Sequence, residues 1–313
     1  MLKEKSIEFA SSAIDCLYDL DAIDVSKDVA ILSVKAEIED LLRLNDEKTL
    51  KKRFEYFSIP GTQPEDFKES FYELGHGKNV LAGIRHKSGS KDQPFVHTLL
   101  DFVPTSADIV ILKDFAAKKF HKFTPKHLSI WMRPSLKIDL SKYEVKQSRQ
   151  YVVGSIAKIR NMAKPVGYEK ITLEKVTTDF DYDWYTEAYT EFHQQRPDLK
   201  DWVPITDRED IDRCISDQLL FKVFVDDLPA GLIGGQNESL LGMSSVYMTE
   251  LLLISKFKGQ GLAVALQRKF IDELPNSMDL IWGTIDAKNL PSLKTALRVG
   301  RLPIRSEYFI KLI

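Results

Sequence analysis

One segment of the sequence combines an apolar strand, two glycines and the start of a helix, and this combination can bind an anion. It reads Leu251-Leu252-Leu253-Ile254-Ser255-Lys256-Phe257-Lys258-Gly259-Gln260-Gly261-Leu262-Ala263. The first backbone N–H groups of a helix lack an intrahelical acceptor, and the helix dipole adds positive charge at the same end. Gly259 and Gly261 let the backbone approach a bulky diphosphate, and Lys258 adds a positive charge. These features predict a binding site for a phosphorylated ligand.

The glycine turn also permits other interpretations. A P-loop requires G-x-x-x-x-G-K-[ST], a spacing that the sequence lacks. A Rossmann fingerprint requires G-x-G-x-x-G, and Val264 stands where the third glycine would be. Both nucleotide motifs are therefore excluded. A simple glycine turn that opens a surface helix remains the alternative to the anion site.

The same turn resembles the pyrophosphate-binding signature Q/R-x-x-G-x-G/A of the GCN5-related N-acetyltransferases, the GNAT superfamily. Lys258, Gly261 and Ala263 stand in its three defining places, with lysine replacing the usual glutamine or arginine. Two further blocks occur in the family's order. The segment 224–234 resembles a hairpin of the family, and Asn289 to Gly300 resembles its N-x-x-A/S-x-x-x-x-x-x-x-G segment. The C-terminal half therefore resembles a GNAT domain.

This resemblance implies acetyl-CoA, or another acyl-CoA, as cosubstrate, and no metal. The diphosphate would lie on the turn from Lys258 to Ala263. In the family, the strand before the turn separates from its neighbour and holds the pantetheine arm through main-chain groups. The resemblance assigns that role to three consecutive residues of this chain: Leu252, Leu253 and Ile254. Asn289 and Ser292 fall in the segment that contacts the same arm, with an N-cap of the following helix as the alternative role of Asn289.

Acyl transfer to an amine needs a base, and the departing thiolate can use an acid. The family's frequent tyrosine acid falls on Ala296, and the base position of some members falls on Thr284. We therefore predict Glu250 as the base, because burial in its apolar strand would raise its pKa, with a half-exposed residue facing a lysine as the alternative. Tyr308 on the last strand is the predicted acid, unless it only packs. The terminal carboxylate of Ile313 is a third candidate.

The resemblance places the acceptor site on the first two helices of the GNAT-like half and on their loop. That region carries aromatic and charged groups suited to a small polar amine or amino acid: Tyr185, Tyr189, Glu191, His193, Arg196, Asp198 and Trp202. The predicted function is an acyl-CoA-dependent N-acyltransferase that works by direct attack of the amine. Because the tyrosine acid is absent, a non-catalytic acyl-CoA-binding or regulatory module is the alternative.

Composition narrows the range of partners. The 313 residues include 44 basic and 46 acidic side chains, so no overall charge favours nucleic acid or a membrane surface. Residues 251–313, however, hold ten Lys or Arg and five Asp or Glu, which suits a polyphosphate. The apolar runs are too short to span a membrane, and charge precedes any apolar block at the start of the chain. Cys16 and Cys214 form no metal-binding pattern. We expect a cytoplasmic protein and make no prediction of its oligomeric state.

Hydrophobic periodicity predicts an α+β fold with a mixed central sheet flanked by helices, in two domains divided at residues 163 and 164. Residues 1–163 are predicted to be helical over 7–20, 26–42, 48–56 and 107–120, and extended over 79–85, 95–103, 127–132 and 151–156. Their β-α-β order suggests either a degenerate acyltransferase-like copy or an unrelated cap. The basic turns 76–78 and 83–89 are interpreted as anion contacts, a lid or ordinary hairpin turns.

Residues 164–313 are predicted to form the GNAT-like acyl-CoA-binding catalytic domain. The segment 161–167 is its predicted linker to the first half. Helices are expected over 182–194, 208–216, 261–274 and 292–299. Strands are expected over 171–176, 220–225, 230–235, 247–254, 280–286 and 307–312.

Overall fold

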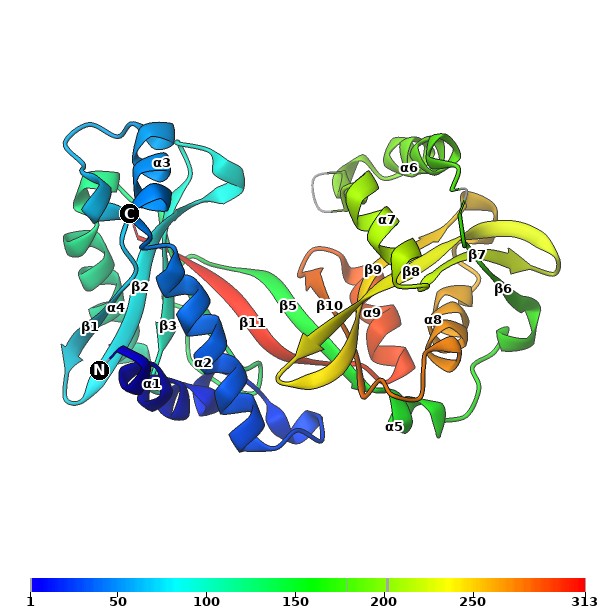
Figure 1. The fold of residues 1–313 in the computed structure, drawn as a ribbon, viewed down its shortest axis with the longest axis horizontal. Helices are drawn as coiled ribbons and strands as arrows, with labels where there is room; N and C mark the ends of the chain where they lie inside the picture. Colours follow the sequence, from blue (N-terminus) through cyan, green and yellow to red (C-terminus); the bar gives the residue numbers. More distant parts are fainter. Residues whose placement is uncertain (1, 179, 201–202, 313) are drawn as a thin grey trace. The chain divides into compact units, whose positions relative to one another are not determined.

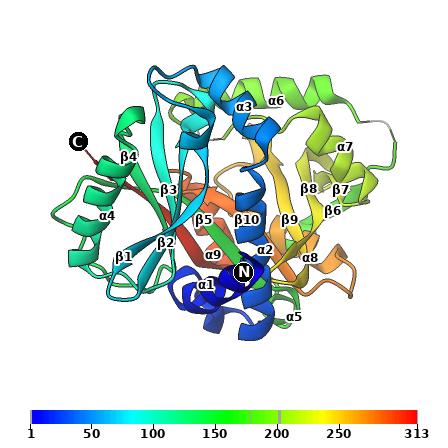
Figure 2. The same ribbon diagram turned by 60° about the vertical axis from the view of Figure 1, so that its left-hand side comes forward.

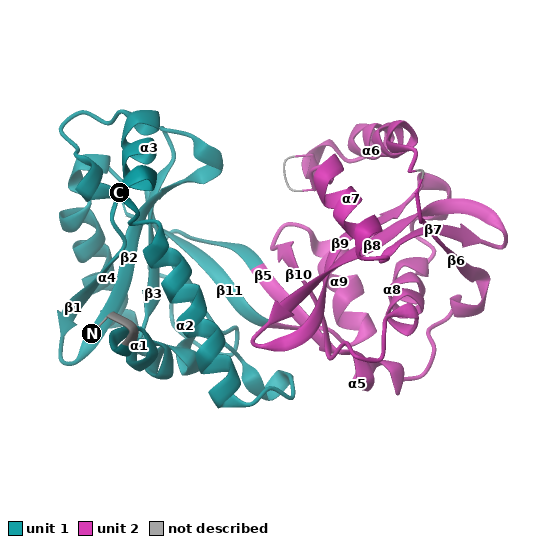
Figure 3. Cartoon of the chain, in the orientation of Figure 1, with its two compact units in different colours: residues 1–149, 304–313 teal, residues 150–303 magenta. Residues whose placement is uncertain are grey.

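The computed structural model describes residues 2–178, 180–200 and 203–312. The chain folds into two compact units (Figure 3). Unit 1 comprises residues 1–149 and 304–313, and unit 2 comprises residues 150–303. The two units therefore divide between residues 149 and 150, rather than between the predicted residues 163 and 164. Most of the last strand belongs to unit 1.

Unit 1 combines four helices with a sheet. The helices are α1 (Leu2–Leu17), α2 (Lys27–Arg43), α3 (Glu47–Phe57) and α4 (Ser106–Lys119). The strands are β1 (Ser70–Gly75), β2 (Lys78–His86), β3 (Pro94–Leu100), β4 (His127–Met132), the first half of β5 (Val145–Ser155) and most of β11 (Leu302–Lys311). Short 3-10 turns occur at η1 (Leu20–Ala22), η2 (Pro64–Phe67), η3 (Lys87–Gly89) and η4 (His121–Phe123).

The sheet of unit 1 is mixed, with the order β1-β2-β3-β4-β11. Strands β1, β2 and β3 are antiparallel neighbours, β3 and β4 are parallel, and β11 runs antiparallel to β4. Helix α4 packs on one face of this sheet (Figures 1 and 2). Its residues Ile109, Leu112 and Ala116 belong to the same buried cluster as Val96 and Ile130 of the sheet. The parallel pair β3–β4 is connected through α4, which is the β-α-β order expected from the sequence.

Unit 2 also combines helices with a mixed sheet. Its helices are α5 (Ile156–Arg160), α6 (Tyr182–Gln195), α7 (Arg208–Ser216), α8 (Leu262–Glu273) and α9 (Leu290–Val299). Its strands are the second half of β5, β6 (Ile171–Lys175), β7 (Leu220–Val225), β8 (Leu228–Leu240), β9 (Met243–Leu253) and β10 (Leu280–Asp286). The 3-10 turns are η5 (Tyr168–Lys170), η6 (Pro197–Leu199) and η7 (Ser255–Phe257).

The strand order in unit 2 is β5-β10-β9-β8-β7-β6. Strands β6 to β9 are antiparallel neighbours, and β9 and β10 are parallel. Helices α6 and α7 lie on one face of this sheet and α8 on the other (Figure 1). Alternate residues face these layers: Leu252 clusters with residues of α6 and α7, whereas Leu253 clusters with residues of α8. Asp181 and Asp207 cap α6 and α7 by accepting the Trp184 and Asp210 amides, each at 2.9 Å. The mixed sheet flanked by helices agrees with the predicted fold class.

The predicted linker 161–167 lies within unit 2. The buried Arg268 guanidinium of α8 donates to the carbonyls of Met162 and Arg160, at 2.8 and 2.6 Å. It also forms a 3.1 Å ion pair with Asp272. These bonds hold the segment against α8, which is why its Pro and Gly residues do not mark the boundary between the units.

Strand β1 is absent from the sequence-based prediction. It is an edge strand in which no residue is fully buried, so it lacks the clear alternation that identifies a half-buried strand. In the described part of the chain, no helix is both long enough and apolar enough to cross a membrane. Those residues also contain no group of three or more His, Cys, Asp or Glu side chains arranged to hold a metal ion.

Candidate functional site

The glycine turn joins the end of β9 to the start of α8. Gly259 and Gly261 both have φ of +76°, in the left-handed region that favours glycine. Gly261 is the N-cap of α8 and has no side chain to cap the helix. A Cβ atom at either glycine would meet nothing within 4 Å. The backbone of the turn therefore borders open space where a ligand can approach.

The turn is held in place by bonds that leave the start of α8 free. Gln260 Nε2 donates to the Lys256 carbonyl at 2.8 Å, and Ser255 Oγ donates to Gln195 Oε1 of α6 at 2.9 Å. The amides of Leu262 and Ala263 open the helix, so neither has an intrahelical acceptor. These amides and the positive end of α8 are suited to an anion, and the binding of a ligand there stays a prediction.

Lys258 lies beside this turn and packs on α6. Its Nζ is 4.1 Å from the centre of the Phe192 ring, a cation–π contact. Partial burial lowers the pKa of its amine. The contact fixes the side chain between the turn and α6, and its part in phosphate binding stays a prediction.

Strand β9 has a free edge just before the glycine turn. Strand β10 pairs with it only at Ser245 to Tyr247, whereas β8 pairs with β9 as far as Leu253. The Ile254 amide donates to the Ala230 carbonyl of β8 at 2.9 Å. Along an antiparallel strand, residues that are hydrogen-bonded to the neighbouring strand alternate with residues that are not. The main-chain groups of Leu252 therefore also face β8, whereas those of Leu253 face the open edge. Of the three predicted pantetheine contacts, Leu253 thus presents free main-chain groups.

Glu250 lies on β9 opposite Gly234, next to a β-bulge in the β8–β9 pair. Its carboxylate is buried and accepts three hydroxyl groups: Tyr185 and Tyr189 of α6, the latter at 3.0 Å, and Thr206 at 3.1 Å. Burial raises the pKa of Glu250, and these hydroxyls oppose the rise. The alternative of a half-exposed residue facing a lysine is wrong. The role of base stays a prediction.

The two tyrosines stay protonated beside this carboxylate. Burial raises the pKa of Tyr185 and Tyr189, and the negative charge of Glu250 raises both further. They stand four residues apart on α6, so they project from the same face of the helix. The result is a fixed pair of donors aimed at one carboxylate.

The remaining predicted acceptor residues do not converge on Glu250. His193 Nε2 bonds to the Val203 carbonyl at 2.9 Å, which is a structural contact. Arg196 and Asp198 form an exposed 2.7 Å ion pair with each other. Glu191 accepts Gln195 Nε2 at 2.9 Å on the exposed side of α6. Trp202 lies outside the described residues.

The predicted contacts after β10 have structural partners. Asn289 Oδ1 accepts the Ser292 amide at 3.3 Å and caps α9, which confirms the alternative role given to Asn289. The Thr284 hydroxyl bonds to the Tyr247 hydroxyl at 2.9 Å. Ala296 is buried against Val152 and Ile285. No acid stands at the family's tyrosine position.

The predicted acid Tyr308 belongs to unit 1, whereas Glu250 belongs to unit 2. Tyr308 is paired with Ile130 of β4 and packs against the unit 1 core, and burial raises its pKa. The structure therefore does not bring the predicted acid and base together in one unit. Ile313 lies outside the described residues.

Two polar groups of the site were missed by the sequence analysis. Thr206 precedes α7 and donates to Glu250, but a threonine in a loop carries no signal of its own. Arg301 is 2% exposed and lies between β9, β10 and α8. Its neighbours are remote in the chain, so its burial has no local pattern in the sequence.

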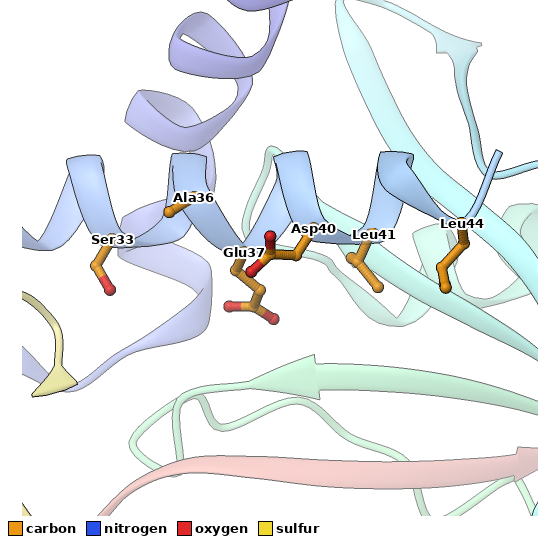
Figure 4. Close-up of a pocket in the computed structure, with 6 residues that line it drawn as sticks. All are labelled: Ser33, Ala36, Glu37, Asp40, Leu41 and Leu44. Carbon is orange, nitrogen blue, oxygen red and sulfur yellow. The ribbon is translucent and has the colours of Figure 1, made fainter. Parts of the chain in front are cut away.

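A hollow of about 420 Å³ lies away from these residues, along α2 of unit 1. Figure 4 shows its lining side chains along a single helix: Ser33, Ala36, Glu37, Asp40, Leu41 and Leu44. Glu37 within it accepts two bonds from Arg305, each at 2.9 Å. The hollow contains none of the predicted site residues.

Comparisons with known proteins give matches among solved structures alone. No family model and no curated protein matches the sequence. An acetyltransferase of the GNAT family from Colwellia psychrerythraea is 12% identical over 86% of this chain and 96% of its own, with a TM-score of 0.47. A tandem GNAT protein from the clavulanic acid biosynthesis pathway is 11% identical over 86% and 96%, with a TM-score of 0.41. A GCN5-related N-acetyltransferase from Sphaerobacter thermophilus is 13% identical over 75% and 76%, with a TM-score of 0.42.

Proposed function

We propose that the protein is an acyl-CoA-dependent N-acyltransferase that transfers an acyl group, most simply acetyl, to a small polar amine or amino acid. The observation that carries the proposal is the free edge of β9, which leads directly into the uncapped start of α8 at Gly261. Coenzyme A matches both features. Its amide-bearing arm can pair with a strand edge, and its diphosphate suits free helix amides.

The residues of unit 2 have defined tasks in this reaction. The amine nitrogen attacks the thioester carbonyl carbon, a C–N bond forms, and the carbonyl electrons move to oxygen. A main-chain N–H at the open edge, as at Leu253, is suited to donate to that oxygen. Glu250 takes the proton of the amine, directly or through a neighbouring hydroxyl. The electrons on oxygen then re-form the C=O bond as the C–S bond breaks, and the electron pair of the C–S bond leaves on sulfur.

A second candidate function is a non-catalytic acyl-CoA-binding module. It is favoured by the buried Ala296 at the family's acid position and by Tyr308 lying in unit 1. In this case the free edge and the anion site would still bind the cofactor. The two candidates therefore differ in turnover and agree in binding.

The test combines CoA binding with acyl transfer. Calorimetry measures CoA binding, and thiol release from acetyl-CoA is followed across a panel of amines and amino acids. Binding with amine-dependent thiol release supports the enzyme. Binding without turnover on any amine supports the binding module, and absence of binding at micromolar CoA overturns both.

We also propose that unit 1 is a degenerate copy of the unit 2 fold. The order β2-β3-α4-β4 in unit 1 parallels β8-β9-α8-β10 in unit 2, with an antiparallel pair followed by a parallel one. In both units, a helix connects the two parallel strands. Isolated unit 2, residues 150–303, should then retain CoA binding if it folds alone. Unit 1 should bind no CoA.

A further inference from the structure

Arg301 is a buried cation in the middle of unit 2. Its guanidinium donates to Met248 Sδ of β9 at 2.8 Å, to Val152 O of β5 at 2.9 Å and to Gln267 Oε1 of α8 at 3.3 Å. Its Nε atom is buried and has no hydrogen-bond partner in the described structure. All of these contacts are neutral, so the charge has no counter-ion among them.

Other buried arginines of the chain do have counter-ions. Arg268 pairs with Asp272 at 3.1 Å, and Arg305 pairs with Glu37 at 2.9 Å. A buried charge without a partner is strongly unfavourable. Burial accordingly lowers the pKa of the Arg301 guanidinium to about 10, and the nearby Tyr247 raises that pKa by a smaller amount. Arg301 is therefore a buried guanidinium whose hydrogen-bond partners are all neutral groups.

The guanidinium lies where β9 and β10 separate. The last paired residues are Tyr247 and Trp282, and the next residues, Met248 and Gly283, are both neighbours of Arg301. A Cβ atom on Gly283 would stand 3.1 Å from Nη2 of Arg301. Glycine at this place thus leaves room for the guanidinium beside the opening between the strands.

We propose that Arg301 stabilises the negative charge that forms on the sulfur of coenzyme A when the C–S bond breaks. The inference rests on the proposed function, because it requires the thioester to lie at the opening between β9 and β10. The thiolate receives the electron pair of the C–S bond, and the fixed guanidinium offsets its charge without transferring a proton. This supplies by charge what an acid at position 296 would supply by protonation.

The test is the acidity of the CoA thiol in its complex with the full-length protein. Thiolate ultraviolet absorbance is recorded against pH, and the same titration with desulfo-CoA, which has no thiol, is subtracted. Burial raises the pKa of Cys16 to about 12 and of Cys214 to about 11, so these thiols do not interfere at lower pH. We expect the bound thiol to titrate about one pKa unit or more below free CoA.

Variants separate the charge of Arg301 from its packing. Arg301→Met should still bind CoA, and its bound thiol should lose the downward shift. Arg301→Lys should keep part of the shift, and the exposed Lys294→Met on α9 should keep all of it. A wild-type complex with an unshifted thiol overturns the inference without any variant. So does an Arg301→Met complex that keeps the full shift. If the wild-type protein binds no CoA, the proposed function fails before this inference is reached.

Discussion

Helices α4 and α8 each follow a strand that pairs antiparallel with the strand before it and parallel with the strand after it. The N-termini of the two helices nevertheless differ. Helix α4 begins with a closed capping box: the Thr105 hydroxyl accepts the Asp108 amide at 3.3 Å, and Asp108 Oδ2 accepts the Thr105 amide at 2.8 Å. Lys78 adds an ion pair to Asp108 at 2.6 Å. Helix α8 begins at Gly261, with no side chain over its amides.

This difference shows how one arrangement can serve either stability or binding. In unit 1, the Asp108 carboxylate already occupies the place that an anion would take, and it would repel a phosphate. The nearby Lys78, in the basic hairpin turn between β1 and β2, thus binds a carboxylate of the fold itself. The strands that precede the two helices, β3 and β9, also differ in how much of their edge is unpaired. Strand β3 ends two residues after its last pair with β4, at Thr98, whereas β9 continues for six residues beyond Tyr247.

Closing the open N-terminus should have the largest effect. In Gly261→Val, a β-branched residue would meet a φ of +76° and fill the space beside the turn. Loss of two charge-assisted bonds of about 1.5 kcal/mol each predicts at least about 100-fold weaker CoA binding. Calorimetry measures the affinity, and thermal unfolding measures the stability.

Gly242→Val is the matched control for this change. Gly242 has φ of +75° in the β8–β9 turn, so valine there is strained in the same way. Both variants should lose about 1–2 kcal/mol of stability. Only Gly261→Val should lose CoA affinity. Equal CoA affinities in the two variants would show that the turn is not part of the cofactor site.

Removing the buried carboxylate should have the next largest effect. Glu250→Gln keeps the size of the side chain inside the hydroxyl cluster and removes its basicity. We expect kcat to fall about 100-fold, with little change in CoA affinity. Steady-state rates of thiol release give kcat, and Glu238→Gln on β8 is the control. Full activity of the Glu250→Gln variant would show that another group is the base.

Local patterns predict the parts of the site that are themselves local. The glycine turn could be identified because strand, turn and helix are consecutive in the sequence. Glu250 stood out because one acidic residue interrupts an apolar run. The order of helices and strands follows for the same reason, and edge strand β1 was missed because it is only half-buried.

Features that depend on distant pairing were not predictable in this way. Alternation predicts a strand over 307–312, where the structure has β11 (Leu302–Lys311), but it carries no information on the partner strand, so Tyr308 was assigned to the C-terminal domain. Arg301 follows a helix and looks like a surface residue. Its burial depends on Met248, Gln267 and Val152, which are contributed by three other elements.

A smaller effect is expected from the hydroxyl groups around Glu250. Tyr189→Phe removes a donor that favours the charged carboxylate, so the pKa of Glu250 should rise further. The acidic limb of the pH–rate profile should move to higher pH by about one unit. Tyr182→Phe is the control, because its hydroxyl donates to the Thr206 carbonyl at 2.7 Å instead. If both variants shift the acidic limb of the pH–rate profile equally, that limb does not reflect the ionisation of Glu250.

The smallest effect on binding is expected from opening the capping box of α4. Burial raises the pKa of Asp108, but its bonds from Lys78 and Thr105 prevail and hold that pKa below its usual value of 3.8. The charged form therefore stabilises the fold above that pH, and this contribution is lost as the pH falls through the lowered pKa. Asp108→Asn should lose about 1–2 kcal/mol at neutral pH and progressively less in acid, measured by urea unfolding. CoA affinity should not change, because an uncapped α4 still lacks the glycine turn and the free strand edge. Loss of CoA affinity in this variant would contradict the assignment of the cofactor site to the turn before α8.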